Sequence, residues 1–326
     1  MADDRRQPIL EIRNLSIAYP ISIGTVRAVE DVSLTVYKGE VLGLVGESGC
    51  GKSTLGLSVL RLQRPPGRVT AGSILYEGSD IVAMDEQSLL DVRGKRVAMI
   101  FQNPLTSLDP LMSVEDHFVE TIKVHEPDTL RRAAVERAAA ILADLGIEPR
   151  RLAEYPYQLS GGMRQRIMIG LGLVLKPDLL LADEPTTALD VIVEAGFTEL
   201  LMKLKRQYDL TVVLISHNLG LVAEMADRIA VMYGGRIVEL ATVNEIFEKP
   251  LHPYTKGLME CVPNILLDQK ELTAMPGSPP DLVDPAEHCP FAPRCPKVMD
   301  VCRSKMPPLE DHGGRLAACW LYERKA

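Results

Sequence analysis

Apolar residues near the start of the chain alternate with polar ones in short runs, which is the pattern of half-buried β-strands. The runs are residues 9–19, 25–36 and 40–46, with Gly or Lys-Gly breaks between them. We expect a helix to follow over residues 53–63 and to end before the Arg64-Pro65-Pro66-Gly67 segment. Residues 69–78 then predict a further pair of strands.

The middle of the chain changes from strand patterns to helical spacing, so we expect a helical insertion over residues 103–177. One predicted helical face consists of Leu130, Ala134, Ala138, Ile141, Leu142 and Leu145. Buried strands are expected at residues 96–102, 178–184, 211–216 and 228–240, the last being a hairpin that turns at Gly234-Gly235. Strands that alternate with helices favour a parallel sheet with both faces covered.

The end of the chain is rich in proline and poor in regular patterns. A chain of 326 residues is long enough for two domains. We therefore predict a domain over residues 1–250, with a helical subdomain at about 103–177, and a loop-rich extension over residues 251–326.

Composition and charge narrow the class of protein. The formal net charge of −8 argues against broad nucleic-acid binding, which needs a basic footprint. The first residues lack the apolar core of a signal peptide, and no apolar run approaches the ~18 to 20 residues of a membrane span. We expect a cytosolic protein whose membrane association would come through partners.

A glycine-rich segment, GESGCGKST at residues 46–54, matches the G-x-x-x-x-G-K-[ST] pattern between a predicted strand and a predicted helix. The glycines let backbone N–H groups curl towards phosphate oxygens, and the helix N-terminus adds positive potential. Lys52 is expected to reach the β- and γ-phosphates, and Ser53 to offer a hydroxyl to Mg²⁺. Cys50 fits this loop as a small filler.

An apolar strand that ends in two carboxylates, LLLADEP at residues 179–185, supplies the chemistry that complements the loop. Asp183 fits a Mg²⁺-associated acid at the carboxyl end of a strand. Glu184 fits a general base that polarises the attacking water. Together with the phosphate loop, the pair predicts nucleoside triphosphate hydrolysis.

The octet LSGGMRQR at residues 159–166, with Gln102 before it and EPTTALD and His217 after it, resembles the ATP-binding subunit of ABC transporters. The resemblance covers at least residues 9–248. It implies an α/β fold: a P-loop NTPase core with an antiparallel β subdomain and a helical insertion, followed by a small loop-rich C-terminal domain that contains cysteines. Asn218 is one departure, because many relatives carry Asp there.

The resemblance also implies roles for matching residues. Glu184, His217, Lys52 and Gln102 would be catalytic, and Ser53, Gln102 and Asp183 would hold Mg²⁺. The implied ATP-binding residues are Tyr19, Gly46, Glu47, Ser48, Gly49, Cys50, Gly51, Lys52, Ser53, Thr54, Ser160, Gly161, Gly162 and Asp190. Of these, Tyr19 would stack on adenine, Ser160–Gly162 would bind the nucleotide of an opposing subunit, and Asp190 would lie at the dimer seam. Taken singly, Tyr19 also fits an ordinary strand aromatic and His217 a core histidine.

The segments FQNPLTSLDPLMSV (101–114) and LHPYTKGLMECVP (251–263) resemble the oligopeptide and dipeptide importer subfamily. The resemblance implies import of short peptides at the cytoplasmic face of the membrane. The implied partners are two integral-membrane permeases, a second and different ATPase subunit, and indirectly an extracytoplasmic solute-binding protein. Related importers of oligosaccharides or nickel, and a soluble redox-sensing ABC ATPase, remain alternatives.

Four cysteines near the end of the chain have the pattern C-x5-C-x6-C-x16-C: Cys289, Cys295, Cys302 and Cys319. In a reducing compartment, clustered cysteines indicate metal ligands rather than disulfides. Four thiolates suit either zinc or a [4Fe–4S] cluster, and the subfamily resemblance favours the cluster. Four reduced structural cysteines are the remaining alternative.

Overall fold

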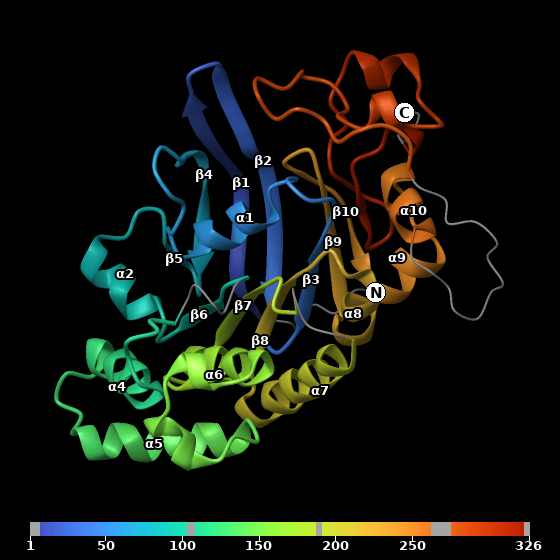
Figure 1. The fold of residues 1–326 in the computed structure, drawn as a ribbon. Helices are drawn as coiled ribbons and strands as arrows, with labels where there is room; N and C mark the ends of the chain where they lie inside the picture. Colours follow the sequence, from blue (N-terminus) through green and yellow to red (C-terminus); the bar gives the residue numbers. More distant parts are fainter. Residues whose placement is uncertain (1–6, 103–107, 187–190, 262–274, 323–326) are drawn as a thin grey trace. The chain divides into compact units, whose positions relative to one another are not determined.

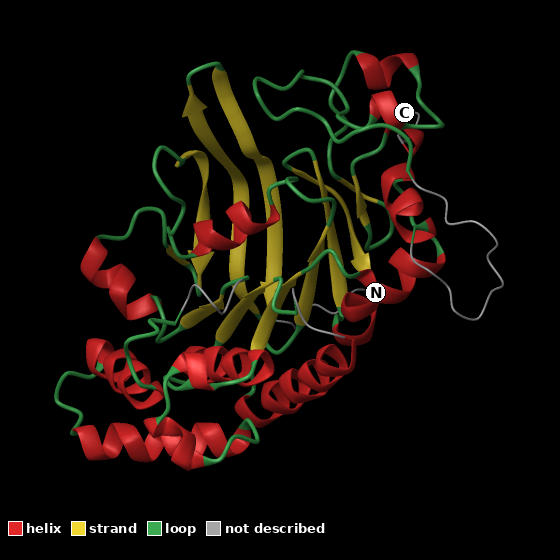
Figure 2. Cartoon of the chain, in the orientation of Figure 1, coloured by secondary structure: helices red, strands yellow, loops and turns green. Residues whose placement is uncertain are grey.

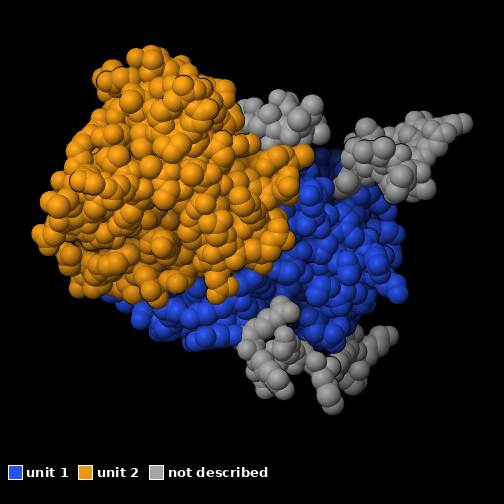
Figure 3. All heavy atoms as spheres, turned by 90° about the horizontal axis from the view of Figure 1, so that it is seen from below, with its two compact units in different colours: residues 1–83, 215–326 blue, residues 84–214 orange. Residues whose placement is uncertain are grey.

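The computed structural model describes residues 7–102, 108–186, 191–261 and 275–322. It divides into two units, one of residues 1–83 with 215–326 and one of residues 84–214 (Figure 3). Within the described residues, no helix combines the length and the apolar character that a membrane crossing requires.

An antiparallel sheet opens the first unit and follows from the alternating pattern at the start of the chain (Figure 1). Its strands are β1 (Pro8–Ile21), β2 (Gly24–Tyr37), β4 (Arg68–Tyr76) and β5 (Ser79–Asp80), in the order β2-β1-β4-β5. The strand pair expected at residues 69–78 was wrong. Most of that stretch is one strand, because Gly72 (φ +85°) makes an irregularity in the β1–β4 register rather than a turn.

A second group of strands in the first unit holds the predicted core. The strands are β3 (Val41–Val45), β9 (Arg228–Tyr233), β10 (Arg236–Thr242), β11 (Glu310–Asp311) and β12 (Leu316–Ala317), in the order β11-β12-β10-β9-β3. β3 runs parallel to β9, and every residue of β3 is buried. The predicted hairpin is confirmed, since β9 and β10 are antiparallel and Gly234 and Gly235 both have positive φ.

The helices of the first unit are short (Figure 2). They are α1 (Lys52–Val59), α8 (Leu219–Met225), α9 (Val243–Glu248) and α10 (Pro253–Glu260), with 3-10 turns η3 (Ala292–Arg294), η4 (Asp300–Arg303) and η5 (Trp320–Tyr322). α1 ends earlier than the predicted residue 63. Leu60 caps it and Arg61 takes a left-handed φ of +49°, which breaks the helical backbone.

The second unit contains the parallel pair β6 (Val97–Ile100) and β7 (Leu179–Asp183), with β8 (Thr211–Ile215) next to β7. Its helices are α2 (Glu86–Val92), α4 (Val114–His125), α5 (Arg131–Asp144), α6 (Gly161–Leu173) and α7 (Val191–Tyr208), with 3-10 turns η1 (Pro149–Ala153) and η2 (Pro156–Gln158). β7 is buried along its whole length, as its uninterrupted apolar sequence predicts.

The predicted apolar face of α5 is correct except at its first position. Ala134, Ala138, Leu142 and Leu145 have no exposed surface. Leu130 is 76% exposed, because it precedes the helix as its N-cap residue with an extended backbone (ψ 140°). Its side chain therefore does not share the helical face.

The C-terminal extension is tied to the strands of the first unit. The Arg27 amide donates to the Leu282 carbonyl (2.8 Å) and the Asp284 amide to the Thr25 carbonyl (2.9 Å). In addition, β12 of the extension pairs antiparallel with β10. The proposed domain boundary near residue 250 stays a prediction.

Candidate functional site

The glycine-rich segment forms a tight loop between β3 and α1. Gly46, Gly49 and Gly51 all have positive φ, and Gly51 is the N-cap of α1 (φ +106°). A Cβ added at Gly46 would lie 2.1 Å from the Met232 carbonyl oxygen, and one at Gly51 would lie 2.1 Å from the Ala28 carbonyl oxygen. The backbone conformation and the space both require glycine, and the residues fit a cradle for phosphate.

Lys52 is buried, with 5% of its surface exposed. Its ammonium donates to the Gly46 carbonyl (2.8 Å) and to the Glu47 carbonyl (3.0 Å) of the same loop. The charge therefore sits inside the loop that the sequence predicted it to serve. Ser53 and Thr54 follow in the first turn of α1, partly exposed.

Gln102 and Glu184 meet at the carboxyl ends of two parallel strands. β6 and β7 pair Ile100 with Ala182, so the residues two positions further along lie side by side. The Gln102 Nε2 donates to Glu184 Oε2 at 2.6 Å. The two residues are 82 positions apart, so the sequence alone did not predict this hydrogen bond.

The two carboxylates after β7 have different environments. Asp183 is 5% exposed at the end of the strand, whereas Glu184 is half-buried and has a left-handed φ of +45°. A non-glycine residue in this region costs about 1–3 kcal/mol, and such strain concentrates at functional sites. The two neighbouring carboxylates therefore differ in exposure and backbone conformation, which suits the separate roles predicted for Asp183 and Glu184.

Ser160 caps α6, and its hydroxyl accepts a hydrogen bond from the Met163 amide at 3.3 Å. Ser160 and Gly161 are exposed, and a Cβ added at Gly161 would meet no atom of the described residues within 4 Å. The N-terminus of this 13-residue helix is therefore open to an external partner.

His217 lies just after β8 and is exposed, so the core-histidine alternative is wrong. Asn218 caps α8: its Oδ1 accepts hydrogen bonds from the amides of Gly220 (3.0 Å) and Leu221 (3.3 Å). An Asp would accept the same bonds, which explains why Asn is an acceptable substitute here.

The Tyr19 ring packs against the loop before β4. A Cβ added at Gly67 would lie 2.3 Å from the Tyr19 ring, so the ring lies directly over this glycine. Tyr19 is partly exposed on β1. Asp190 falls outside the residues that the structure describes.

Two residues outside the sequence-based site bind the phosphate loop. The Glu47 amide donates to the Tyr254 hydroxyl (2.9 Å), and the Glu47 carboxylate accepts from both terminal nitrogens of Arg294 (2.7 and 2.9 Å). Arg294 is 247 positions away in the sequence, so no local pattern signals the contact.

The four cysteines line one small cavity together with His252 and Trp320. Among the described side chains, however, no group of three or more His, Cys, Asp or Glu residues is arranged to hold a metal ion. Burial raises the pKa of Cys289 and Cys319 to about 11, so a ligand would have to displace their protons. The structure thus brings the four thiols to one cavity without arranging them as metal ligands, so the predicted cluster stays a prediction.

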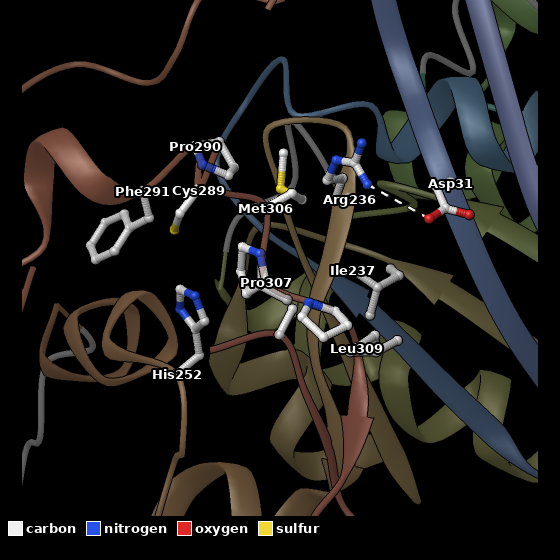
Figure 4. A pocket seen from close by; sticks show the side chains of 13 residues that line it. Asp31, Arg236, Ile237, His252, Cys289, Pro290, Phe291, Met306, Pro307 and Leu309 are labelled. Atoms are coloured by element: carbon white, nitrogen blue, oxygen red, sulfur yellow. Dashed lines mark ion pairs between the residues drawn. The ribbon is translucent and has the colours of Figure 1, made fainter. Parts of the chain in front are cut away.

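A larger pocket of about 290 Å³ adjoins the cysteine segment (Figure 4). Cys289 and His252 line this pocket and also the cavity of the four thiols. At its rim, Arg236 and Asp31 form an ion pair at 3.9 Å. Cys289 thus lies between the cysteine cavity and an open pocket.

Comparison with known proteins decides the family. The chain is 43% identical to the dipeptide transport ATP-binding protein DppD of Bacillus subtilis (strain 168), over 98% of this chain and 96% of that protein. It is 44% identical to the oligopeptide transport ATP-binding protein OppD of the same organism, over 92% of this chain and 85% of that protein. The chain belongs to the ATP-binding proteins of the ABC transporter family.

Two family profiles match separate parts of this ABC ATPase. Residues 29–187 match the profile described as ABC transporter, and residues 238–302 match the one described as oligopeptide/dipeptide transporter, C-terminal region. The predictions of an ABC ATPase and of its subfamily resemblance are confirmed.

A solved structure confirms the fold class. The dimeric structure of the ATP-binding cassette MJ0796 in a post-hydrolysis state, bound to ADP and Pi, superimposes with a TM-score of 0.64 and 26% sequence identity. The match covers 72% of this chain and 98% of that one. The α/β P-loop core predicted from the sequence is therefore correct.

Proposed function

We propose that this ABC ATPase powers the import of short peptides across a membrane. The observation that carries the proposal is the likeness to DppD and OppD, which extends beyond the cassette into the C-terminal region at residues 238–302. A cassette of another transporter class would have no reason to match that region. The proposed location is the cytoplasmic face of the membrane, where the chain is peripheral.

The phosphate loop is proposed to hold ATP. Gly46–Thr54 would surround the phosphates, with Lys52 as the buried cation, and Tyr19 would contact the adenine. Ser53, Gln102 and Asp183 would hold Mg²⁺, which in such sites neutralises charge on the phosphates. The positive φ values at the loop glycines and the burial of Lys52 support this assignment.

Glu184 is proposed as the base that takes a proton from water. The hydrogen bond from Gln102 supports the assignment, because it fixes the carboxylate at the end of β7 (2.6 Å). His217 is proposed to contact the γ-phosphate. Its exposed position between β8 and α8 supports this role.

The site is proposed to be completed by a second ATPase subunit, different from this one, on two permeases served by an external solute-binding protein. Ser160, Gly161 and Gly162 would bind the nucleotide held by that subunit, and Asp190 would lie at the seam. The open N-terminus of α6 supports this arrangement.

The base assignment is tested with Glu184→Gln. Because Gln keeps the shape but cannot accept the proton, we expect ATP hydrolysis to fall by about 10²- to 10⁴-fold while ATP binding persists. Glu120→Gln on an exposed position of α4 is the matched control and should hydrolyse ATP at the normal rate. Normal hydrolysis by the Glu184 variant would contradict the proposed role.

The substrate class is tested in vesicles that contain the purified transporter and its solute-binding protein. We expect short peptides to stimulate ATP hydrolysis and to accumulate on the ATP side. Stimulation by oligosaccharides or nickel instead would indicate a related importer. A chain that never co-purifies with permeases would favour a soluble redox-sensing ATPase.

We propose further that Cys289, Cys295, Cys302 and Cys319 hold a [4Fe–4S] cluster. The convergence of the four thiols on one cavity supports this. Protein purified without oxygen should contain four irons and four sulfides per chain and show visible absorption that a reductant bleaches. Stoichiometric zinc in a colourless protein would assign zinc, and four reactive thiols without metal would leave the cysteines purely structural.

A further inference from the structure

Glu47 is the one acidic residue of the phosphate loop, and three groups hold it in place. Its amide donates to the Tyr254 hydroxyl at 2.9 Å. Its carboxylate accepts two hydrogen bonds from Arg294, at 2.7 and 2.9 Å. Its carbonyl accepts from the Lys52 ammonium at 3.0 Å. The amide and the carboxylate of Glu47 are thus held from outside the loop, and its carbonyl is held by Lys52 within it.

Arg294 is built into the first unit as a rigid donor. Its side chain is 5% exposed, and its guanidinium also donates to the Tyr233 hydroxyl (3.2 Å from Nη1) and to the Pro276 carbonyl (2.8 Å from Nε). A planar guanidinium that makes a bidentate pair of hydrogen bonds fixes both the orientation of the carboxylate and its distance from the guanidinium. The orientation of Glu47 therefore follows the position of Arg294.

The position of Arg294 is set by the C-terminal extension. Arg294 ends the 3-10 turn η3, which lies between Cys289 and Cys295. In the same turn region, Phe291 packs against the rings of Tyr233 (5.3 Å) and Tyr254 (5.5 Å). All three rings are at most 2% exposed, so Phe291 and α10 of the extension form one packed body with the end of β9.

The contact matters for phosphate binding because the loop must present its backbone in one conformation. Glu47 and Gly46 supply the two carbonyls on which the Lys52 ammonium rests. Fixing Glu47 removes conformational freedom that the loop would otherwise lose when it binds phosphate. The loop therefore loses this conformational entropy when the protein folds, and not when the ligand binds.

We propose that Arg294 and Tyr254 are positioning residues for the phosphate loop, so that the C-terminal extension raises the affinity of the cassette for nucleotide. The proposal rests on the proposed ATP site in residues 46–54. It gives the extension a role in the ATPase cycle that is separate from any group the cysteines bind.

The test measures binding of a fluorescent ATP analogue to the purified full-length chain. Arg294→Gln removes the positive charge and the bidentate hydrogen bonds. We expect the affinity for the ATP analogue to fall about ten-fold, which is the scale of a buried hydrogen bond to a charged group. Arg303→Gln, an exposed arginine beside Cys302 in the same extension, is the matched control and should bind normally. Amide hydrogen exchange in residues 46–51 should quicken in the Arg294 variant alone.

A double-mutant cycle separates positioning from general destabilisation. If Arg294 acts through Glu47, then Arg294→Gln should cost no further affinity once Glu47→Gln is present. Should Arg294→Gln fail to fold, Arg294→Lys keeps the positive charge without the bidentate hydrogen bonds. It is expected to bind the ATP analogue with intermediate affinity.

The outcomes are distinct. A lower melting temperature with unchanged nucleotide affinity in the Arg294 variants would overturn the inference and leave a docking contact only. Additive losses in the cycle would overturn it too. A wild-type chain that does not bind the analogue would overturn the proposed ATP site itself.

Discussion

Glu239 offers the sharpest test of how the C-terminal extension is attached. This residue of β10 has no exposed surface. Its carboxylate accepts hydrogen bonds from the amides of Leu251 and His252, both at 2.8 Å, and from Arg315 at 3.3 Å. Glu239→Ala should therefore loosen the start of α10 and the last strands together.

The magnitude follows from the groups that lose a partner. Each of the two amides loses a bond to a carboxylate, worth about 1.5–3 kcal/mol, so the sum is about 3–6 kcal/mol. Arg315 still donates to the Lys249 carbonyl, and water that enters the vacated space recovers part of the loss. We expect a net loss of about 3 kcal/mol, and Glu239→Gln should lose about half of that because it keeps one acceptor.

The assay uses the only tryptophan of the chain. Trp320 lies in the extension, where its indole donates to the Lys305 carbonyl at 3.2 Å, so its fluorescence reports release of this segment. With a urea slope of about 3 kcal/mol per M, the fluorescence midpoint should fall by about 1 M. The exposed neighbour Glu248→Ala is the control. Equal midpoints for the Glu239 and Glu248 variants would refute the reasoning.

Three further predictions concern the loop, acid stability and a helix cap. Gly51→Ala should abolish nucleotide binding, because its Cβ would lie 2.1 Å from the Ala28 carbonyl oxygen, whereas Gly49→Ala, with nothing within 4 Å, should weaken it less in the same titration. Burial lowers the pKa of His252 from 6.5 to about 3, so only the unfolded chain binds this proton between those values. The contribution of His252 to the free energy of unfolding is then full above pH 6.5 and falls as the pH drops, by up to about 1.4 kcal/mol per pH unit. His252→Asn keeps a capping acceptor but does not titrate, so urea titrations of this variant should show a smaller loss of stability at acid pH. Asn218→Ala should cost about 1 kcal/mol in thermal unfolding and Asn218→Asp almost nothing, and equal losses would contradict the capping role.

Local signals predicted the elements that depend on neighbouring residues. The Gly234-Gly235 hairpin and the buried strand β7 formed as expected, because turn chemistry and apolar runs act over a few positions. Periodicity was less reliable at boundaries. It placed Leu130 on a helical face because spacing alone does not show where a helix begins.

The candidate site divides in the same way. The phosphate loop and the paired carboxylates could be identified from consecutive residues, since their chemistry requires particular residue types at fixed spacing. The hydrogen bond between Gln102 and Glu184 required the pairing of β6 with β7, which brings two distant strand ends to one edge.

Short motifs in order were enough to indicate the family and the fold class, which the comparisons confirm, and they predict the residues proposed for phosphate chemistry. The folded chain was needed to show that Arg294 holds Glu47 and that four separated cysteines line one cavity. Such contacts join parts of the chain that are distant in sequence. They depend on how strands, turns and aromatic rings pack together, and residues in such contacts follow no periodic pattern in the sequence.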